Sequence, residues 1–442
     1  MNNQNSQILA RIEAIKAEKP WLETYEIESM IAEETGVDIS EYYEASLKQE
    51  PEKTEPLGKY GAYETEEAEP EKKEEAPAPA APAPQTLTDE EKKLQQDREN
   101  AKKAVEKHAK KQITKAISKE MTKIGITLLI YVILSLGLCV GLSVFLVLVS
   151  GKDIVEASAF VSDSRFSAIF EGCIMLIALA LPFVMYVYFN KLSIGDLVPL
   201  RKLRKGELLP MTFIGLGTVM VTGYITNTLT SGLSLTGANY RYNSVSLGTT
   251  MGEFLISLAC LTIVPAVVET YVFNGVILQV LRRKGGDGFA LVMSALLHAI
   301  MTANFAQMPQ TFVTSIVLGY LVVYSGSLIP AALVRGIELF LFLGITQLGF
   351  VVPDLNSVLF IDILITAILI VASIFSINTM LKRFPNFFQI KRSDRYLSVS
   401  EKVRIALLRP SVLILIVYSV GFSLLQLISL NDIMDLAEKI GL

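Results

Sequence analysis

The sequence predicts an all-α polytopic membrane protein with about nine transmembrane helices and a cytosolic N-terminal arm. Hydrophobic residues make up 51% of the 442 residues and gather in repeated apolar runs. Several runs reach the roughly 18 residues that a helix needs to cross a bilayer. Lys and Arg flank one end of successive runs, whereas the N-terminal part of the chain is polar. We therefore expect a multi-pass protein of a plasma membrane, most simply that of a prokaryote.

The apolar runs give the positions of the expected spans. The fifth and sixth runs are short, and Pro330 is expected to kink the start of the seventh, because proline lacks the N–H that a helix interior needs. The nine spans are expected near residues 124–150, 166–189, 208–231, 250–281, 289–303, 311–324, 328–350, 358–380 and 411–430.

The basic residues between the spans predict the orientation of the chain. With a cytoplasmic N-terminus, three inner loops contain sixteen Lys and Arg residues, and the outer side contains four. Cytoplasmic loops carry such an excess, so the N-terminus is expected inside and the C-terminus outside. These basic residues follow the topology and lack an interleaved aromatic platform, which argues against nucleic acid as a partner. Membrane lipids are the expected anionic neighbours.

The N-terminal arm is expected to have two parts before it reaches the membrane. Residues 1–50 place apolar side chains at helical spacing and predict a small cytosolic helical segment. Residues 51–87 are rich in Glu, Lys, Pro and Ala and predict a disordered acidic linker. Such an arm is too small for a robust core, and we expect residues 1–87 to recruit a cytosolic protein.

A charged juxtamembrane helix is expected over residues 88–123. Thr88 and Glu91 have the spacing of a capping box at its start. Its lysines either contact anionic headgroups or hold the first span at the cytoplasmic face, and the two roles are compatible. The transmembrane bundle is then expected over residues 124–430, with a short tail at 431–442.

Ionisable residues within the expected spans are the main candidates for function. They are Glu269, His298, Arg335 and Glu338. An ionisable side chain at bilayer depth costs at least a few kcal/mol, so it usually faces the bundle interior and marks a functional site. At 1.5 Å per residue, the four lie roughly 19, 15, 12 and 16 Å from the inner face. Because buried charges need partners, we expect one polar cluster.

The cluster is compatible with several kinds of chemistry. A carboxylate beside an imidazole can activate water for hydrolysis. A zinc site needs about three protein ligands, but only one of the two histidines lies at depth and no HExxH pattern exists, so neither a metal nor another cofactor is expected. A transporter's proton relay also uses buried Glu, His and Arg. A structural alternative is an ion-paired clasp between Arg335 and a glutamate that fixes helix packing.

Residues 264–278 (VPAVVETYVFNGVIL) carry a resemblance to a known family. They resemble the first motif of the CPBP family, the CAAX proteases and bacteriocin-processing enzymes, which include type II CAAX prenyl protease-like intramembrane glutamic proteases. That motif is a Pro, a Glu-Glu pair, three residues, Arg and Gly. Glu269 matches the first glutamate, which in this family activates the hydrolytic water with histidine. Thr270 stands at the second glutamate and Asn274 at the arginine.

Two further motifs of the family are recognisable downstream. Residues 294–298 (SALLH) resemble the Phe-xxx-His motif and keep the histidine, His298. Residues 325–335 (SGSLIPAALVR) resemble the third motif, but Arg335 replaces its histidine and Leu339 its asparagine. In the family, that histidine and asparagine help to form the oxyanion hole, and losing one such donor typically costs roughly 100-fold or more in rate.

The resemblance covers roughly residues 165–380 and implies the membrane-protease fold with a degraded active site. It favours a pseudoprotease that binds a membrane peptide or protein partner. The alternative is a divergent intramembrane CAAX-type endopeptidase in which Glu269 and His298 activate water and Arg335 stabilises the oxyanion. A transporter with a buried Glu/His/Arg relay is the third possibility.

The two protease-related hypotheses predict different geometries. An active endopeptidase predicts a water-accessible cavity between spans four, five and seven, with Glu269 and His298 close enough to share a water. A pseudoprotease predicts Arg335 bonded to Glu269 or Glu338, with no such cavity. Asp362 is either a polar member of the bundle or lies near the outer membrane edge, and the edge is the favoured position.

Small residues within the spans are expected to serve packing. Gly215 and Gly217 more simply allow close helix packing than bind phosphate, because no P-loop context surrounds them. The three cysteines all lie within expected spans without a CxxC pattern, and are expected to be packing residues.

Overall fold

The computed structural model describes residues 89–150, 164–204, 206–235, 250–352, 354–385, 387–390 and 396–426. Within these ranges the regular elements are helices, accompanied by one isolated antiparallel bridge between Leu200 and Ser327. The all-α fold class is therefore confirmed. The expected helical segment at 1–50, the linker at 51–87, the cap at Thr88 and the tail at 431–442 lie outside the described residues.

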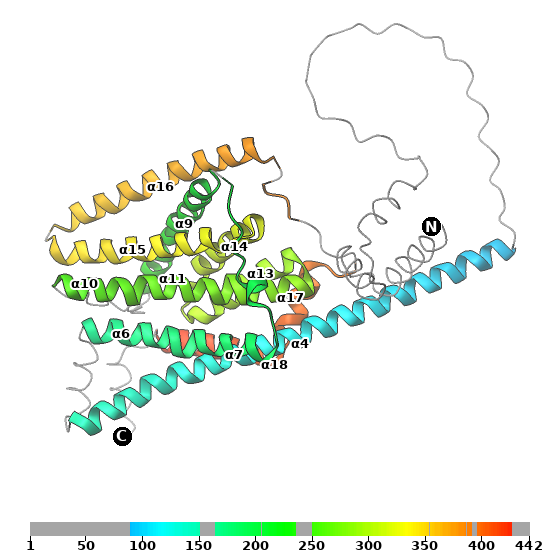
Figure 1. Ribbon diagram of the computed structural model, residues 1–442, viewed down its shortest axis with the longest axis horizontal. Helices are drawn as coiled ribbons and strands as arrows, with labels where there is room; N and C mark the ends of the chain where they lie inside the picture. The colour runs from blue at the N-terminus through cyan, green and yellow to red at the C-terminus, as the bar shows by residue number, and fades with distance from the viewer. Residues whose placement is uncertain are drawn as a thin grey trace, which may run out of the picture. The chain divides into compact units, whose positions relative to one another are not determined.

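The helices carry the labels of Figure 1. In chain order they are α4 (Asp89–Ser150), α6 (Ser164–Ile174), η1 (Met175–Ala180), α7 (Leu181–Phe189), α8 (Ile194–Leu197), α9 (Leu208–Leu235), α10 (Met251–Leu258), η2 (Ala259–Ile263), α11 (Val264–Glu269), η3 (Thr270–Ile277), α12 (Leu278–Gly285), α13 (Asp287–Thr302), α14 (Met308–Ser325), α15 (Ile329–Val351), α16 (Leu355–Arg383), α17 (Val399–Leu407) and α18 (Pro410–Leu425). The chain divides into the units Met1–Lys110 and Lys111–Leu442. The first unit is described only as the start of α4, and the bundle belongs to the second.

The chain is a multi-pass membrane protein. Among the described residues, seven helices are long and apolar enough to cross a membrane, or eight if α17 and α18, bent by 78°, form one span. Every predicted span overlaps a helix, but the count of nine is not confirmed. The helices α13 and α18 have only 16 residues each, or about 24 Å, against roughly 30 Å of hydrocarbon.

The helices of the bundle pack in layers around the run from α10 to α12. Figure 1 shows this run between α6–α7 and α15, with α15 lying beside α16. Helix α13 packs against α12 and α14, and α9 packs against α14, α15 and α16. Fully buried apolar side chains such as Val276, Leu297 and Leu321 fill the space between these elements. The segment that carries Glu269 therefore lies at the centre of the bundle.

Short π-helical segments interrupt two of the spans just before a proline. The segment η1 is followed directly by α7, which has Pro182 in its first turn. Likewise, η2 is followed directly by α11, which has Pro265 in its first turn. Because proline cannot donate a backbone hydrogen bond, the ladder is disturbed there. A third π-segment, η3, begins directly after Glu269. Such segments are often found at functional sites.

Close helix contacts depend on the two glycines of α9. A Cβ added to Gly215 would lie 2.5 Å from Cγ2 of Val334, and one added to Gly217 would lie 2.3 Å from Cβ of Ser373. Both positions therefore require glycine for the observed packing, which confirms the packing role. The expected kink at Pro330 is corrected: this proline lies in the first turn of α15 and starts the helix, where its missing N–H is harmless.

Candidate active-site cluster

The four intramembrane ionisable residues form one connected cluster. Glu269 ends α11, and Arg335 and Glu338 lie one turn apart on α15. Nε of Arg335 donates to Oε2 of Glu269 at 2.7 Å, and Nη1 donates to Oε2 of Glu338 at 2.8 Å. The side chains of the two glutamates are only 12% and 11% exposed. One guanidinium thus binds two buried carboxylates and links α11 to α15.

His298 on α13 is fixed by contacts on both ring nitrogens and on one ring face. Its Nε2 lies 3.8 Å from Oε2 of Glu269, and its Nδ1 lies 2.7 Å from Oγ of Ser315 on α14. Its ring stacks on Phe273 of η3 with centroids 4.0 Å apart and an angle of 11° between the planes. The imidazole therefore has a single orientation, with Nε2 directed toward Glu269.

The separation of His298 from Glu269 has a definite chemical meaning. At 3.8 Å, Nε2 and Oε2 are too far apart for a direct hydrogen bond, whose upper range is about 3.2 Å. The gap is short enough for one water to contact both atoms, as general-base hydrolysis requires. However, the same Oε2 already accepts the hydrogen bond from Arg335. Water and guanidinium would compete for this oxygen.

Thr270 and Asn274, which replace the family's second glutamate and arginine, are buried on η3 with 3% and 5% exposure. The hydroxyl of Thr270 makes no hydrogen bond within the part of the chain that the structure describes. Asn274 faces α14, since its Oδ1 would lie 3.6 Å from a Cβ added to Gly319. The described hydrogen bonds do not join either residue to Glu269 or His298. The structure therefore does not bring these two positions into the polar cluster.

The Ser-Gly-Ser-Leu stretch that opens the third motif forms a structural turn. Gly326 has a φ of +63° and ends α14 in the left-handed conformation that favours glycine. Oγ of Ser325 accepts a hydrogen bond from the backbone N–H of Ser327, and Leu328 N donates to Pro199 O at 2.9 Å. The turn thus positions the start of α15, and with it Arg335, against the loop before α9.

A cavity of about 520 Å³ adjoins the cluster. It lies between α9, α13, α14, α15 and α16, and His298, Arg335 and Glu338 line one part of it. Glu269 is not among the lining residues and lies behind the side chains of Arg335 and His298. The neutral polar residues that line the cavity are Asn227, Thr302, Gln307, Gln310, Thr311, Thr314, Ser315, Thr346, Thr366 and Tyr224.

The cavity matches neither predicted geometry completely. A cavity is present beside the cluster, as an endopeptidase requires, and the fifth and seventh predicted spans line it. The fourth span, which carries Glu269, does not, and its place is taken by α9, α14 and α16. Arg335 is bonded to both glutamates, as a pseudoprotease requires. The structure therefore combines one feature of each geometry.

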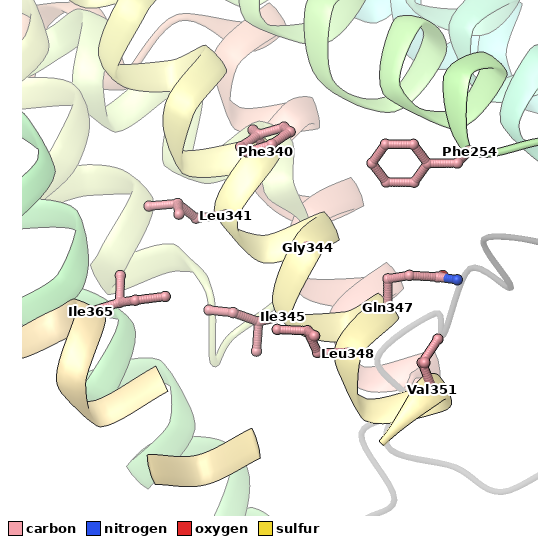
Figure 2. A pocket seen from close by; sticks show the side chains of 9 residues that line it. All are labelled: Phe254, Phe340, Leu341, Gly344, Ile345, Gln347, Leu348, Val351 and Ile365. Atoms are coloured by element: carbon pink, nitrogen blue, oxygen red, sulfur yellow. The ribbon is translucent and has the colours of Figure 1, made fainter. Parts of the chain in front are cut away.

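A second, apolar cavity of about 360 Å³ lies between α10, α15 and α16. Figure 2 shows Phe254 of α10 facing Phe340, Gln347 and Val351 of α15, with Ile365 of α16 on the opposite side. Leu341 and Ile345 line both cavities, so these two side chains form the wall between them.

Two further residues lie at the cluster or at its cavity. Ser315 binds His298, and a sequence signal for it existed, because Thr311, Thr314 and Ser315 place polar groups on one face of α14 at helical spacing. For Asp362, the sequence leaves open a polar position in the bundle beside the favoured position near the membrane edge. It lies about two turns into α16 and lines the cavity, which the local sequence did not reveal.

Comparison with known protein families identifies a match that spans the three motif segments. Residues 251–338 match the sequence profile of the family described as type II CAAX prenyl endopeptidase Rce1-like. This segment contains Glu269, His298 and Arg335, and the match supports the resemblance to the CPBP and CAAX protease family. No curated protein and no solved structure matches the chain.

Proposed function

Because residues 251–338 form a CAAX endopeptidase-like domain in a multi-pass membrane protein, we propose that the protein is a pseudoprotease of this family. It keeps the family's membrane fold, has lost peptide hydrolysis, and uses the cavity beside Arg335 to bind a membrane peptide or a membrane protein segment. Its polar arm, residues 1–87, recruits a cytosolic protein to the same place in the plasma membrane.

The hydrogen bond from Arg335 to Glu269 is the main observation that supports the proposed loss of peptide hydrolysis. Glu269 stands where the family has the glutamate that activates water with histidine. Its Oε2, the oxygen that faces His298, is occupied by the guanidinium at 2.7 Å. A general base must be within hydrogen-bond reach of the water that it deprotonates. An oxygen held in an ion pair and absent from the cavity lining is disfavoured as that base while the pair is intact, because the guanidinium competes with water for it.

The oxyanion position supports the same proposal. Leu339 lines the cavity where the family has an asparagine, and a leucine side chain has no N–H to donate. Arg335 stands at the histidine, but two of its N–H groups are already directed at carboxylates. Oxyanion stabilisation requires donors directed at the position where negative charge develops. The described geometry directs them at Glu269 and Glu338 instead.

The lining of the cavity supports peptide binding. Amide and hydroxyl groups from α9, α14, α15 and α16 alternate there with apolar side chains such as Leu318 and Phe342. This mixture suits a peptide, because its backbone needs hydrogen-bond partners inside a membrane and its side chains need apolar contact. The cavity-lining residues of α15 run from Arg335 to Thr346, or about 16 Å, which is the length of roughly five extended residues.

A divergent endopeptidase is the second candidate, and one observation favours it. Nε2 of His298 and Oε2 of Glu269 are 3.8 Å apart, so a water could contact both if Arg335 withdrew. The arginine would then act as the oxyanion donor.

A cleavage assay on the purified full-length protein separates the two candidates. Prenylated and plain membrane-peptide libraries would be incubated with the wild type, Glu269→Gln and, as a control outside the cluster, Asp196→Asn, because Asp196 pairs with Arg283. An active CAAX endopeptidase in the same detergent serves as the positive control. We expect no turnover by any of the three proteins and equal peptide capture by all of them. Turnover that Glu269→Gln abolishes and Asp196→Asn retains would establish the endopeptidase instead.

A further inference from the structure

The charged side chains at the cavity are unbalanced in favour of negative charge. Arg335 contributes one guanidinium, and its two partners, Glu269 and Glu338, contribute two carboxylates. Asp362 on α16 contributes a third carboxylate to the lining. One guanidinium therefore faces three carboxyl groups, and with all three ionised the site is negative whether the imidazole of His298 is neutral or protonated.

Asp362 is a cavity-lining carboxyl group that has no charged partner among the described residues. Within the described part of the chain it forms no ion pair, whereas both glutamates share Arg335. It lies two turns from the start of α16, and α16 follows α15 after a short turn. Antiparallel neighbours joined in this way place Asp362 near the Thr346 end of α15, away from Arg335. The cavity thus has, at one end, an arginine whose charge is offset by two glutamates and, toward the other end, an uncompensated carboxylate.

We infer that the cavity selects a peptide segment that carries a cationic group, a Lys or Arg side chain or an amine, and disfavours one that brings a carboxylate. This inference rests on the proposed peptide-binding function and specifies its ligand. A cation beside Asp362 neutralises a carboxylate that has no other charged partner among the described residues of the cavity lining. A carboxylate gains little from Arg335, because two glutamates already offset the guanidinium, and it is repelled by Asp362.

The neutral lining accommodates the rest of such a segment. Asn227 and Gln310 present amides from α9 and α14, and Thr311 and Thr366 present hydroxyls. Amides and hydroxyls both donate and accept, so they suit a peptide backbone irrespective of its sequence. Selection is therefore expected at the charged group rather than along the backbone.

Binding of three matched peptides tests this inference. Each would be a capped, dye-labelled apolar peptide with one central Lys, Gln or Glu and no other charge. The full-length protein would be placed in nanodiscs of phosphatidylcholine, because anionic lipids would attract the Lys peptide by themselves. Empty nanodiscs give the baseline, and fluorescence anisotropy gives Kd. We expect the Lys peptide to bind roughly tenfold or more tightly than the Glu peptide, with the Gln peptide between them.

Asp362→Asn provides the specific variant, since it leaves the Arg335 cluster intact. We expect it to reduce the Lys-to-Glu preference by roughly threefold or more, chiefly by weakening Lys binding. Asp196→Asn is the matched control, because Asp196 pairs with Arg283 and does not line the cavity. It should leave the preference unchanged.

The outcomes distinguish this inference from the proposed function. Equal binding of all three peptides, tighter binding of the Glu peptide, or a Lys preference that Asp362→Asn does not alter would overturn the inference and leave peptide binding standing. Failure of the folded protein to bind any of the three peptides would overturn both.

Discussion

The guanidinium of Arg335 donates to the same carboxylate oxygen of Glu269 that faces the imidazole of His298. This contact joins α11 to α15 across the centre of the bundle. A buried carboxylate is costly unless it is paired, so the contact has a structural role whether or not the site reacts. In the proposed function, this contact occupies the oxygen that would otherwise take the proton from water.

The ion-pair cluster is expected to contribute strongly to stability. Arg335→Met removes the charge at similar length and leaves two buried carboxylates unpaired, so we expect a loss of about 3–5 kcal/mol in the free energy of unfolding. Adding Glu269→Gln and Glu338→Gln should restore much of this loss, because no charge then remains unpaired. Thermal unfolding in detergent, followed by circular dichroism, measures both effects. An unchanged midpoint for Arg335→Met would show that the pairs contribute nothing.

The contact between Ser315 and His298 is expected to set the state of the imidazole. Ser315→Ala leaves Nδ1 without its partner, which should cost about 1–3 kcal/mol of stability and change the tautomer balance of the ring. The chain has two histidines, so in a His108→Gln background the imidazole ¹⁵N resonances report on His298 alone. They should shift in Ser315→Ala and stay in place in Ser193→Ala, a change in an exposed loop. Identical spectra for all three proteins would contradict the hydrogen bond.

The glycines of α9 are expected to be intolerant of even one methyl group. Gly217→Ala would place a Cβ 2.3 Å from Cβ of Ser373. We expect this overpacking to lower the free energy of unfolding by about 1–3 kcal/mol. Gly232→Ala on the same helix has no atom within 4 Å of the added Cβ. There the change should be neutral or slightly stabilising, because alanine favours helices. Equal unfolding midpoints for the two variants would contradict close packing of α9 on α16.

The sequence predicted the polar cluster because the physics leaves few alternatives. An ionisable side chain in an apolar span must find a partner, and counting residues placed Glu269, His298, Arg335 and Glu338 at one level. The structure joins all four through the contacts of Arg335 and His298. The same reasoning could not decide which carboxylate Arg335 would bind, and the answer is both.

Other features depend on tertiary packing and have no local signal. The π-segment η3 leaves the hydropathy of the span unchanged, so periodicity did not reveal it. Thr270 and Asn274 are neighbours of Glu269 in sequence, yet Asn274 faces α14. Asp362 reaches the cavity only because α16 packs beside α9 and α15. Contacts between distant segments decided these three cases.

The orientation of the bundle follows from charge and is open to direct test. The run from Met251 to Gly285 is long and apolar enough to cross the membrane and ends in Arg282, Arg283 and Lys284, which the positive-inside rule places in the cytoplasm. In a background with the three native cysteines replaced by alanine, we expect Lys284→Cys to react with a membrane-impermeant maleimide only after the cells are opened. Gly252→Cys, at the other end of the run, should react in intact cells. Gly252 and Lys284 are both exposed in the structure, so the reagent can reach either position. The reverse labelling pattern would place the N-terminus outside, and the arm could then no longer recruit a cytosolic protein.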